Sequence, residues 1–293
     1  MQSNDYKIKQ VPIEQTAFFT ERLGSSSLGL LKPQADANRH YDADGVVMQR
    51  NRDGQWVYNP LRIAMIATQL VMMYMQTPTR EIYQALERHV GFLQSAKIKK
   101  LHNGLPYYEY RFDFPLHNNK AEMMRGPWIS GLAQGQILVL IAHLHKVFSK
   151  NYAAWGNKVM QTLLVEPCGK IDSDGFYWID EYPHETVFDR TLNGHINGLM
   201  GLYYWHLKTG NDEAEQFLKA GITTVEHYMQ QYRVPGWASA YCLAHRTPCH
   251  KADWKYHKCH IKQFEWLFAI TGELRFKNFK NNLVRDMAAA GQK

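Results

Sequence analysis

Long apolar runs are missing from the sequence, and their absence limits how the chain can meet a membrane. The longest mainly apolar stretches, 63–75 and 137–147, are interrupted by polar residues and are shorter than the roughly 20 residues that cross a bilayer. The N-terminal residues contain no apolar segment followed by a small-residue cleavage site, as a secretory signal would. The sequence therefore predicts no membrane span, and we expect a cytoplasmic location.

Cysteine is also scarce, which excludes a disulfide scaffold. Only four cysteines occur among 293 residues, far fewer than in small disulfide-rich domains. A late cluster, from Cys249-His250 to Cys259-His260, carries groups of the kind that bind zinc but lacks CxxC or HExxH spacing. Phosphate loops and dinucleotide fingerprints are absent too. We therefore predict no metal site and no organic cofactor.

Acidic residues are outnumbered by basic ones, so the chain favours anionic partners. It has 34 Lys and Arg against 27 Asp and Glu, a formal charge of +7. Such a field concentrates polyanions near the surface, and nucleic acid, anionic lipid and acidic glycan all fit this charge. Hydrophobic residues make up 45% of the chain, enough to bury the core of one large domain.

Helical periodicity dominates the sequence from residue 60 onward. Apolar residues recur at helical spacing, Thr79 is placed to cap a helix, and Gly210 is placed to end one. The pattern predicts four antiparallel helical hairpins, which are about 60–76 with 79–97, 129–148 with 151–165, 190–208 with 212–232, and 256–271 with 275–287.

The connections between these helices are of two kinds. Short turns join the helices within a pair, whereas long aromatic-rich linkers, 102–127, 169–189 and 234–254, separate the pairs. If the hairpins stack around an axis, all long linkers lie on one rim, where a site is most expected. We predict a mainly α, (α/α)4-like barrel or toroid over 60–293 with irregular linkers on one rim, and an N-terminal segment, 1–59.

The N-terminal segment is predicted to form a β-hairpin that caps the barrel. Asp44-Gly45 and Asp53-Gly54 lie beside apolar runs, as residues of tight hairpin turns do. The segment and the barrel are therefore expected to form one unit.

Two linkers carry groups suited to proton transfer. Glu181 and Tyr182 precede a proline that favours an extended approach, and an acid beside a phenol suits proton transfer on a sugar. Tyr256 is flanked by Lys255 and His257, and we expect these cationic neighbours to lower the pKa of its phenol.

These segments resemble the C-terminal part of the heparan and heparosan glucuronyl C5-epimerases. The resemblance rests on six motifs in the family's order, GQWVYNP (54–60), SGLAQGQ (130–136), DEYP (180–183), LNG (192–194), YxLxH (241–245) and WxYHxxHIxQ (254–263). It implies a barrel of helical hairpins, and it implies that Glu181, Tyr182, Tyr241 and Tyr256 are the catalytic residues. It also leaves a structural calcium ion open, without indicating its ligands.

The sequence departs from this family in one motif. Cys242 and Ala244 stand where the family commonly has aspartate and arginine. Arginine binds both oxygens of a uronate carboxylate, so its loss leaves the carboxylate contact open and favours the interpretation of the chain as a non-catalytic binding protein unless another arginine substitutes for it. We predict Arg246 first, because it lies in the same linker, and then Arg190 or Arg125. The remaining candidates for sugar binding are Asn193, His260, Gln134, Trp128 and His245.

The expected function is inversion of C5, from D-glucuronate to L-iduronate, within a heparosan-like acidic polysaccharide. This chemistry needs proton carriers on both faces of the ring, for which we predict Tyr182 and Tyr256, with Tyr241 orienting the ring or carboxylate. A polysaccharide lyase begins with the same proton removal and stays open, as does a non-catalytic glycan-binding protein. A glycoside hydrolase ranks third, since Glu181 lacks an obvious second carboxylate. No nucleic-acid partner is expected, and a homodimer is left open.

Overall fold

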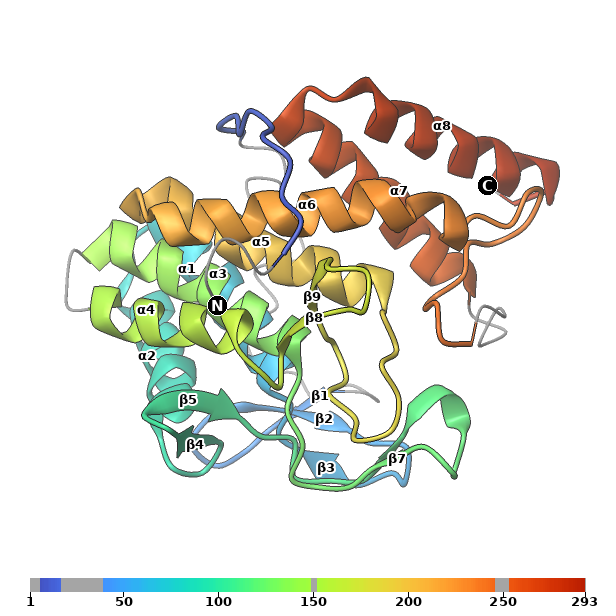
Figure 1. Ribbon diagram of the computed structural model, residues 1–293. Coiled ribbons are helices and arrows are strands. Elements are labelled where there is room, and N and C mark those ends of the chain that lie inside the picture. Colours follow the sequence, from blue (N-terminus) through green and yellow to red (C-terminus); the bar gives the residue numbers. More distant parts are fainter. Residues whose placement is uncertain (1–5, 17–38, 149–151, 246–252, 293) are drawn as a thin grey trace.

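Eight α-helices dominate the part of the chain that the computed structural model describes, which is residues 6–16, 39–148, 152–245 and 253–292 (Figure 1). None of these described helices is long and apolar enough to cross a bilayer. They form four hairpins, and the predicted helical-hairpin fold is confirmed. The pairs are α1 (Pro60–Gln76) with α2 (Arg80–Gln94), α3 (Gly131–Phe148) with α4 (Tyr152–Leu164), α5 (Leu192–Thr209) with α6 (Asp212–Tyr232), and α7 (Asp253–Thr271) with α8 (Leu274–Ala289).

The helix ends follow local capping signals. The Thr79 hydroxyl accepts a hydrogen bond from the backbone N–H of Ile82 at 3.3 Å, as predicted for the start of α2. Gly210 ends α5 with a left-handed φ of 69°, and Asn211 then caps α6. Only glycine adopts that φ at little cost, so the α5–α6 hairpin is encoded locally.

The first helix of each hairpin packs against the first helix of the next. Thus α1 lies against α3, α3 against α5, and α5 against α7. Helices α3 and α5 touch backbone to backbone, because a Cβ on Gly135 would lie 2.6 Å from the Cα of Gly198, and one on Gly201 would lie 2.6 Å from the Gly135 carbonyl oxygen. Any side chain at these positions would push the two helices apart.

The N-terminal segment forms a three-stranded antiparallel sheet where we predicted a hairpin. Its strands are β1 (Arg39–Tyr41), β2 (Val47–Arg50) and β3 (Trp56–Val57), in that order. Two turns join them, with Gly45 at φ 78° and Gly54 at φ 81°. Strand β2 contacts α1, so the sheet lies against the first hairpin. How the chain divides into domains stays a prediction.

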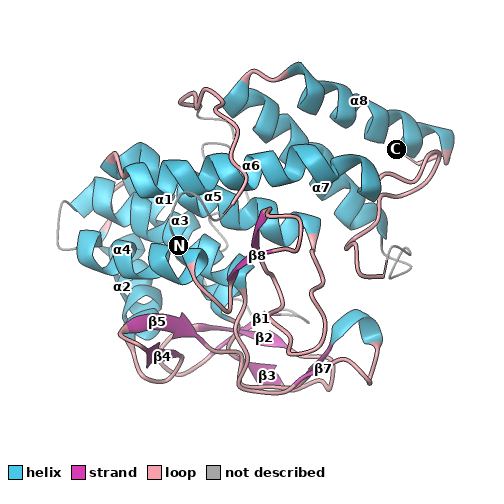
Figure 2. Cartoon of the chain, in the orientation of Figure 1, coloured by secondary structure: helices cyan, strands magenta, loops and turns pink. Residues whose placement is uncertain are grey.

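The linkers contain more regular structure than we predicted. They include three two-stranded antiparallel sheets, and most of the strands lie on one side of the helices (Figure 2). Asn103 and Gly104 have φ values of 51° and 78°, as expected for an Asn-Gly hairpin turn, a signal that the sequence carried. The pairs are β4 (Lys99–His102) with β5 (Leu105–Tyr108), β6 (Phe114–Pro115) with β7 (Met123–Met124), and β8 (Gly169–Ile171) with β9 (Tyr177–Ile179).

Candidate functional site

A cavity of about 670 Å³ opens between the N-terminal sheet, the linkers and the inner helices. This volume lies within the roughly 300–1,000 Å³ typical of small-ligand pockets. Residues from both ends of the chain line it, including Arg52 after β2, Phe114 in β6, Glu181 and Tyr182 after β9, and Tyr256 in α7. Two of the three predicted long linkers, 102–127 and 169–189, therefore meet at this cavity, whereas no described residue of the third, 234–254, lines it.

The four residues predicted as catalytic lie together. The Tyr241 hydroxyl donates to Glu181 Oε2 at 3.3 Å and lies 3.2 Å from the Tyr182 hydroxyl. The rings of Tyr241 and Tyr256 meet edge to face, with centroids 4.5 Å apart. Glu181, Tyr182 and Tyr256 line the cavity. Tyr241 is buried behind them at 7% exposure, where it connects the other three rather than contacting the cavity as predicted.

Local backbone contacts hold Glu181 in this position. The N–H of Gly131, at the start of α3, donates to the Asp180 carbonyl at 3.1 Å, and the Asp180 carboxylate pairs with Lys170 at 2.7 Å. Gly194 leaves room for the acid itself, because a Cβ there would lie 2.2 Å from Glu181 Oε2. The LNG motif thus makes space for the carboxyl group.

Burial sets the protonation of this group of residues. It raises the pKa of Glu181 to about 8, with the nearby Asp189 and Asp180 adding to the shift and the phenols opposing it. Burial also raises the pKa of Tyr182 and of Tyr241 well above the usual phenol value. All three side chains are therefore mainly uncharged at neutral pH.

The predicted lowering of the Tyr256 pKa is wrong. Burial raises the pKa of this phenol, and the nearby Glu181 raises it further. Lys255 is exposed and lies over the ring face at 5.6 Å, while burial lowers the pKa of His257 and so favours its neutral form. Neither sequence neighbour outweighs desolvation.

Positive charge reaches the cavity from residues that the sequence analysis did not select. Arg50, Arg52, Arg62 and Lys255 all line it. Arg52 donates to the Pro115 carbonyl at 3.1 Å, and its guanidinium lies 4.5 Å from the centre of the Phe114 ring. These contacts hold it between the N-terminal sheet and the first linker. The R-N-R spacing at 50–52 was the available signal, in a segment that we had interpreted as a cap.

An aromatic wall faces these cations. Trp128 lines the cavity and stacks on Tyr110 with ring centroids 4.0 Å apart. Phe114 stacks on the rings of both Trp128 and Tyr182, with centroid distances of 5.7 Å and 5.8 Å. The Trp128 indole N–H is bonded to the Phe112 carbonyl at 2.8 Å, which fixes the ring. Apolar ring faces of this kind pack well against the C–H faces of sugars.

Asn193 is placed as a substrate-binding residue should be. It lies at the start of α5, lines the cavity and is 5% exposed. Its Oδ1 is buried and has no hydrogen-bond partner within the described part of the chain. A buried polar atom of this kind normally has a partner, and a sugar hydroxyl could supply it.

Three other candidates lie elsewhere. The Gln134 amide donates to the Pro106 carbonyl and to Thr162 inside the core. His260 is fully buried against Ser239, and burial lowers its pKa to about 3. Arg190 lies over Phe188 at 5.7 Å rather than among the cavity residues. None of these three side chains lines the cavity, so the structure does not bring them to the binding site as predicted.

Of the predicted arginine replacements that the structure describes, neither Arg190 nor Arg125 lines the cavity. Arg125 is an exposed residue paired with Asp113. Arg246, our first choice, lies outside the described residues, as do Cys249 and His250 of the late cysteine and histidine cluster. Among described residues, Arg52 is the arginine best placed to bind a carboxylate in the cavity.

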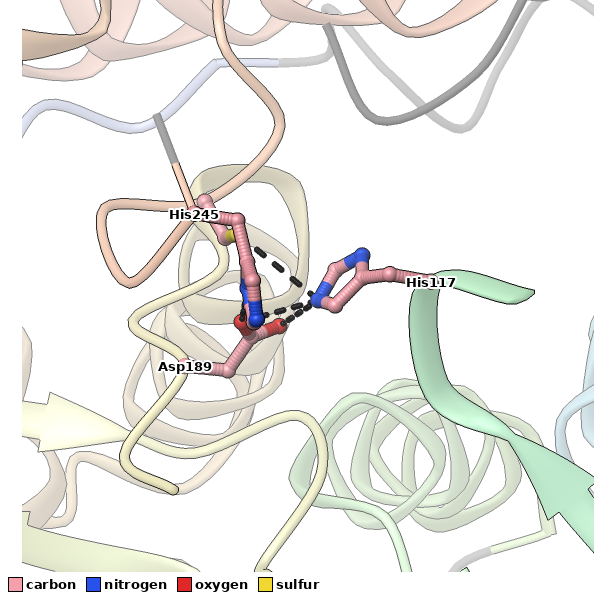
Figure 3. A group of neighbouring side chains, drawn as sticks. His117, Asp189 and His245 are labelled. Atoms are coloured by element: carbon pink, nitrogen blue, oxygen red, sulfur yellow. Dashed lines mark hydrogen bonds and ion pairs between the residues drawn. The ribbon is translucent and has the colours of Figure 1, made fainter. Parts of the chain in front are cut away.

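His245 belongs to a second group of side chains next to the residues predicted to be catalytic. His117, Asp189, Cys242 and His245 each direct one donor atom inward, and these atoms all lie within 4.8 Å of one another (Figure 3). His245 thus contacts Asp189 and Cys242 instead of lining the cavity as predicted. The sequence signal was the Cys-x-x-His spacing of Cys242 and His245, which we had interpreted only as a departure from a motif.

The fold is one of helical hairpins, and its cavity is lined by aromatic rings and several arginines beside a hydrogen-bonded acid and phenols. These features indicate a carbohydrate-binding protein with groups suited to proton transfer. The family comparison agrees. The chain belongs to the D-glucuronyl C5-epimerase C-terminus family, whose model matches residues 102–285.

Two individual proteins are similar to this chain. An uncharacterized protein of Methanocaldococcus jannaschii is 27% identical over 182 residues, which cover 59% of this chain and 56% of that protein. The chain thus spans about half the length of this curated relative. The structure of a cellobiose 2-epimerase from Bacillus thermoamylovorans is similar with a TM-score of 0.59 at 11% identity, covering 78% of this chain and 59% of that chain. That likeness is one of fold.

Proposed function

We propose that this protein inverts C5 of D-glucuronate units, giving L-iduronate, within a heparosan-like acidic polysaccharide. The observation that carries this proposal is the hydrogen-bonded chain from Glu181 through Tyr241 to Tyr182, which meets a cavity that Tyr256 also lines. Family membership supports the reaction class. The chemistry requires an acid and a base that reach both faces of one ring carbon.

The cavity cations suit the charge that the reaction creates. Removing the C5 proton places negative charge on the neighbouring carboxylate, and donors fixed in advance stabilise that charge best. Arg52 is held by the Pro115 carbonyl and by the Phe114 ring, and it is our candidate for binding the carboxylate. Arg50 and Arg62 supply further positive charge along the cavity for an acidic polymer.

The buried groups can pass protons without exchanging them with water at every step. In the proposed mechanism Tyr182 takes the C5 proton while its own phenolic proton moves through Tyr241 to the ionised Glu181. Tyr256, which is hydrogen-bonded to Tyr241, then donates its proton to the opposite face of C5. The proton held by Glu181 then returns through Tyr241 to Tyr256. Since Tyr182 already holds the proton taken from C5, every group regains its starting protonation.

Incubation of heparosan in heavy water, followed by NMR, tests this function. We expect iduronate signals, deuterium at C5 and unchanged chain length. Unsaturated uronate and shortened chains would instead indicate a lyase, and tight binding without deuterium entry would indicate a binding protein. Either outcome overturns the proposal.

Single phenol deletions test the residue roles. Tyr182→Phe and Tyr256→Phe should each slow deuterium entry by about 10²–10⁴-fold, the usual contribution of one acid or base. Tyr83→Phe is the matched control, because Tyr83 packs against Phe148 away from the cavity. Undiminished exchange in both cavity variants would remove the assignment while leaving the activity itself open.

A further inference from the structure

We propose that His117, Asp189, Cys242 and His245 bind a zinc ion that fastens three linkers together beside the catalytic tyrosines. The four donors come from three separate linkers. His117 lies in the 3₁₀ turn η2 (Leu116–Asn118), Asp189 precedes α5, and Cys242 and His245 precede α7. Figure 3 shows His117, Asp189 and His245 pointing toward a common centre.

The spacing of the donors fits a tetrahedral metal site. Bond lengths of about 2.0 Å to nitrogen and about 2.3 Å to sulfur put tetrahedral donors roughly 3.3–3.5 Å apart. His117 Nε2 lies 2.9 Å from Asp189 Oδ1 and 3.7 Å from Cys242 Sγ. His245 Nδ1 lies 3.4 Å from the same sulfur and 3.3 Å from Asp189 Oδ1. The remaining separations among the four donor atoms are within 4.8 Å, so shifts of up to about an ångström would seat an ion.

The donor types select zinc over calcium or magnesium. Calcium takes six to eight oxygen ligands and magnesium prefers oxygen in an octahedron, whereas two imidazoles, a thiolate and one carboxylate are the mixed set that zinc binds. Cys242 would bind as a thiolate, its proton passing to solvent. The two negative ligands then balance the two positive charges of the ion, which matters because Asp189 and Cys242 are fully buried.

The surrounding contacts are those of an oriented metal ligand set. The other ring nitrogen of His245, Nε2, lies 3.0 Å from Glu122 Oε1, the carboxylate–histidine arrangement that commonly supports a metal-bound imidazole. Thr191 donates its hydroxyl to Asp189 Oδ2 at 2.8 Å. Backbone N–H groups of Leu243 and Ala244 donate to the Asp189 carbonyl at 3.2 and 3.3 Å. These backbone hydrogen bonds join the segment that carries Asp189 to the segment that carries Cys242 and His245 before any ion binds.

The site lies where it can position a catalytic residue. Cys242 directly follows Tyr241, and the ring of His117 meets the ring of Tyr241 edge to face at 5.7 Å. An ion bound here would fix the backbone of Tyr241 to two other linkers. Zinc is thus assigned a positioning role and no part in the proton transfer.

Metal content and cobalt spectroscopy test the site directly. The purified full chain, incubated with zinc alone and desalted, should retain about one zinc per chain by mass spectrometry of the metal. Saturating zinc should raise Tm by roughly 5 °C. Cobalt in place of zinc should give the d–d bands of a tetrahedral ion together with a thiolate-to-cobalt charge-transfer band. Failure to bind either ion stoichiometrically overturns the proposal.

Matched variants locate the ion. Cys242→Ser should abolish the charge-transfer band, and His245→Ala should lower zinc affinity by at least tenfold. Cys259→Ala and Cys249→Ala, which remove thiols that are not among the four proposed ligands, should keep both the band and the zinc. Cys242→Asp keeps a metal-binding side chain at this position without a thiolate, so it should bind cobalt but lack the charge-transfer band. Loss of zinc in Cys249→Ala with retention in Cys242→Ser would place the ion elsewhere and refute the assignment.

Discussion

Replacing Glu181 by glutamine should remove the base of the proposed reaction. It should also remove the pH dependence that the buried acid gives to the reaction rate and to the free energy of unfolding. Burial raises the pKa of Glu181 to about 8. Each pH unit changes the ionised-to-neutral ratio tenfold, so about one-tenth of the molecules carry the Glu181 carboxylate at pH 7 and about half at pH 8. The rate of deuterium entry at C5 in the wild-type protein should therefore rise roughly 50-fold between pH 6 and pH 8 and then level off.

The same substitution, which should lower activity at high pH, should raise folding stability relative to the wild type as the pH rises. Since the folded-state pKa is about 8 and the usual value is 4.5, the folded protein binds more protons than the unfolded chain between these two pH values. The contribution of Glu181 to the free energy of unfolding of the wild type accordingly falls as pH rises through this window, by up to about 1.4 kcal/mol per pH unit, and stops falling above it. Glutamine has no such titration. Glu181→Gln should be more stable relative to wild type at pH 9 than at pH 5.

Two measurements check this reasoning. Deuterium entry by NMR should be about 10²–10⁴-fold slower in Glu181→Gln at pH 8, and urea unfolding at pH 5, 7 and 9 should give the wild type the steeper loss of stability. Equal pH slopes for the two proteins would contradict the buried-acid account. A variant that retains full exchange activity would show that Glu181 is not the base.

Three further outcomes follow from the structure. Gly194→Ala places a Cβ against the Glu181 carboxyl, at 2.2 Å, and should lower kcat tenfold or more by displacing it, which steady-state epimerisation rates would reveal. Gly156→Ala places a Cβ 2.1 Å from the Trp205 indole and should destabilise the α4–α5 contact by about 1–3 kcal/mol, measurable by urea unfolding. Arg52→Ala should raise KM for the acidic polymer and weaken its salt dependence, seen by comparing KM at two ionic strengths.

The helical hairpins could be predicted because their signals are local. Thr79 and Gly210 act on backbone groups a few residues away, and apolar periodicity marks each buried face. The proton-transfer residues were predicted from motif resemblance, and the structure brings them together. Their exact duties stay predictions, since they depend on a bound sugar.

The residues that were missed depend on contacts distant in sequence. His117 meets Asp189 across 72 positions, so no spacing in either segment marks the pair. Arg52 reaches the cavity only because the N-terminal sheet folds onto the linkers. The Tyr256 pKa was predicted from neighbours in the chain, whereas burial in three dimensions controls it. Gln134 was misassigned for the same reason, as its amide bonds lie within the core.

The glycine contact between α3 and α5 decides which parts of the molecule can give way to a polymer. With Gly135 and Gly198 in backbone contact, α3 and α5 have no side chain between them at this point and cannot be pressed closer together. If the proposed substrate is right, the opening that admits a long glycan is expected on the sheet and linker side of the cavity, where Arg52 and Phe114 lie.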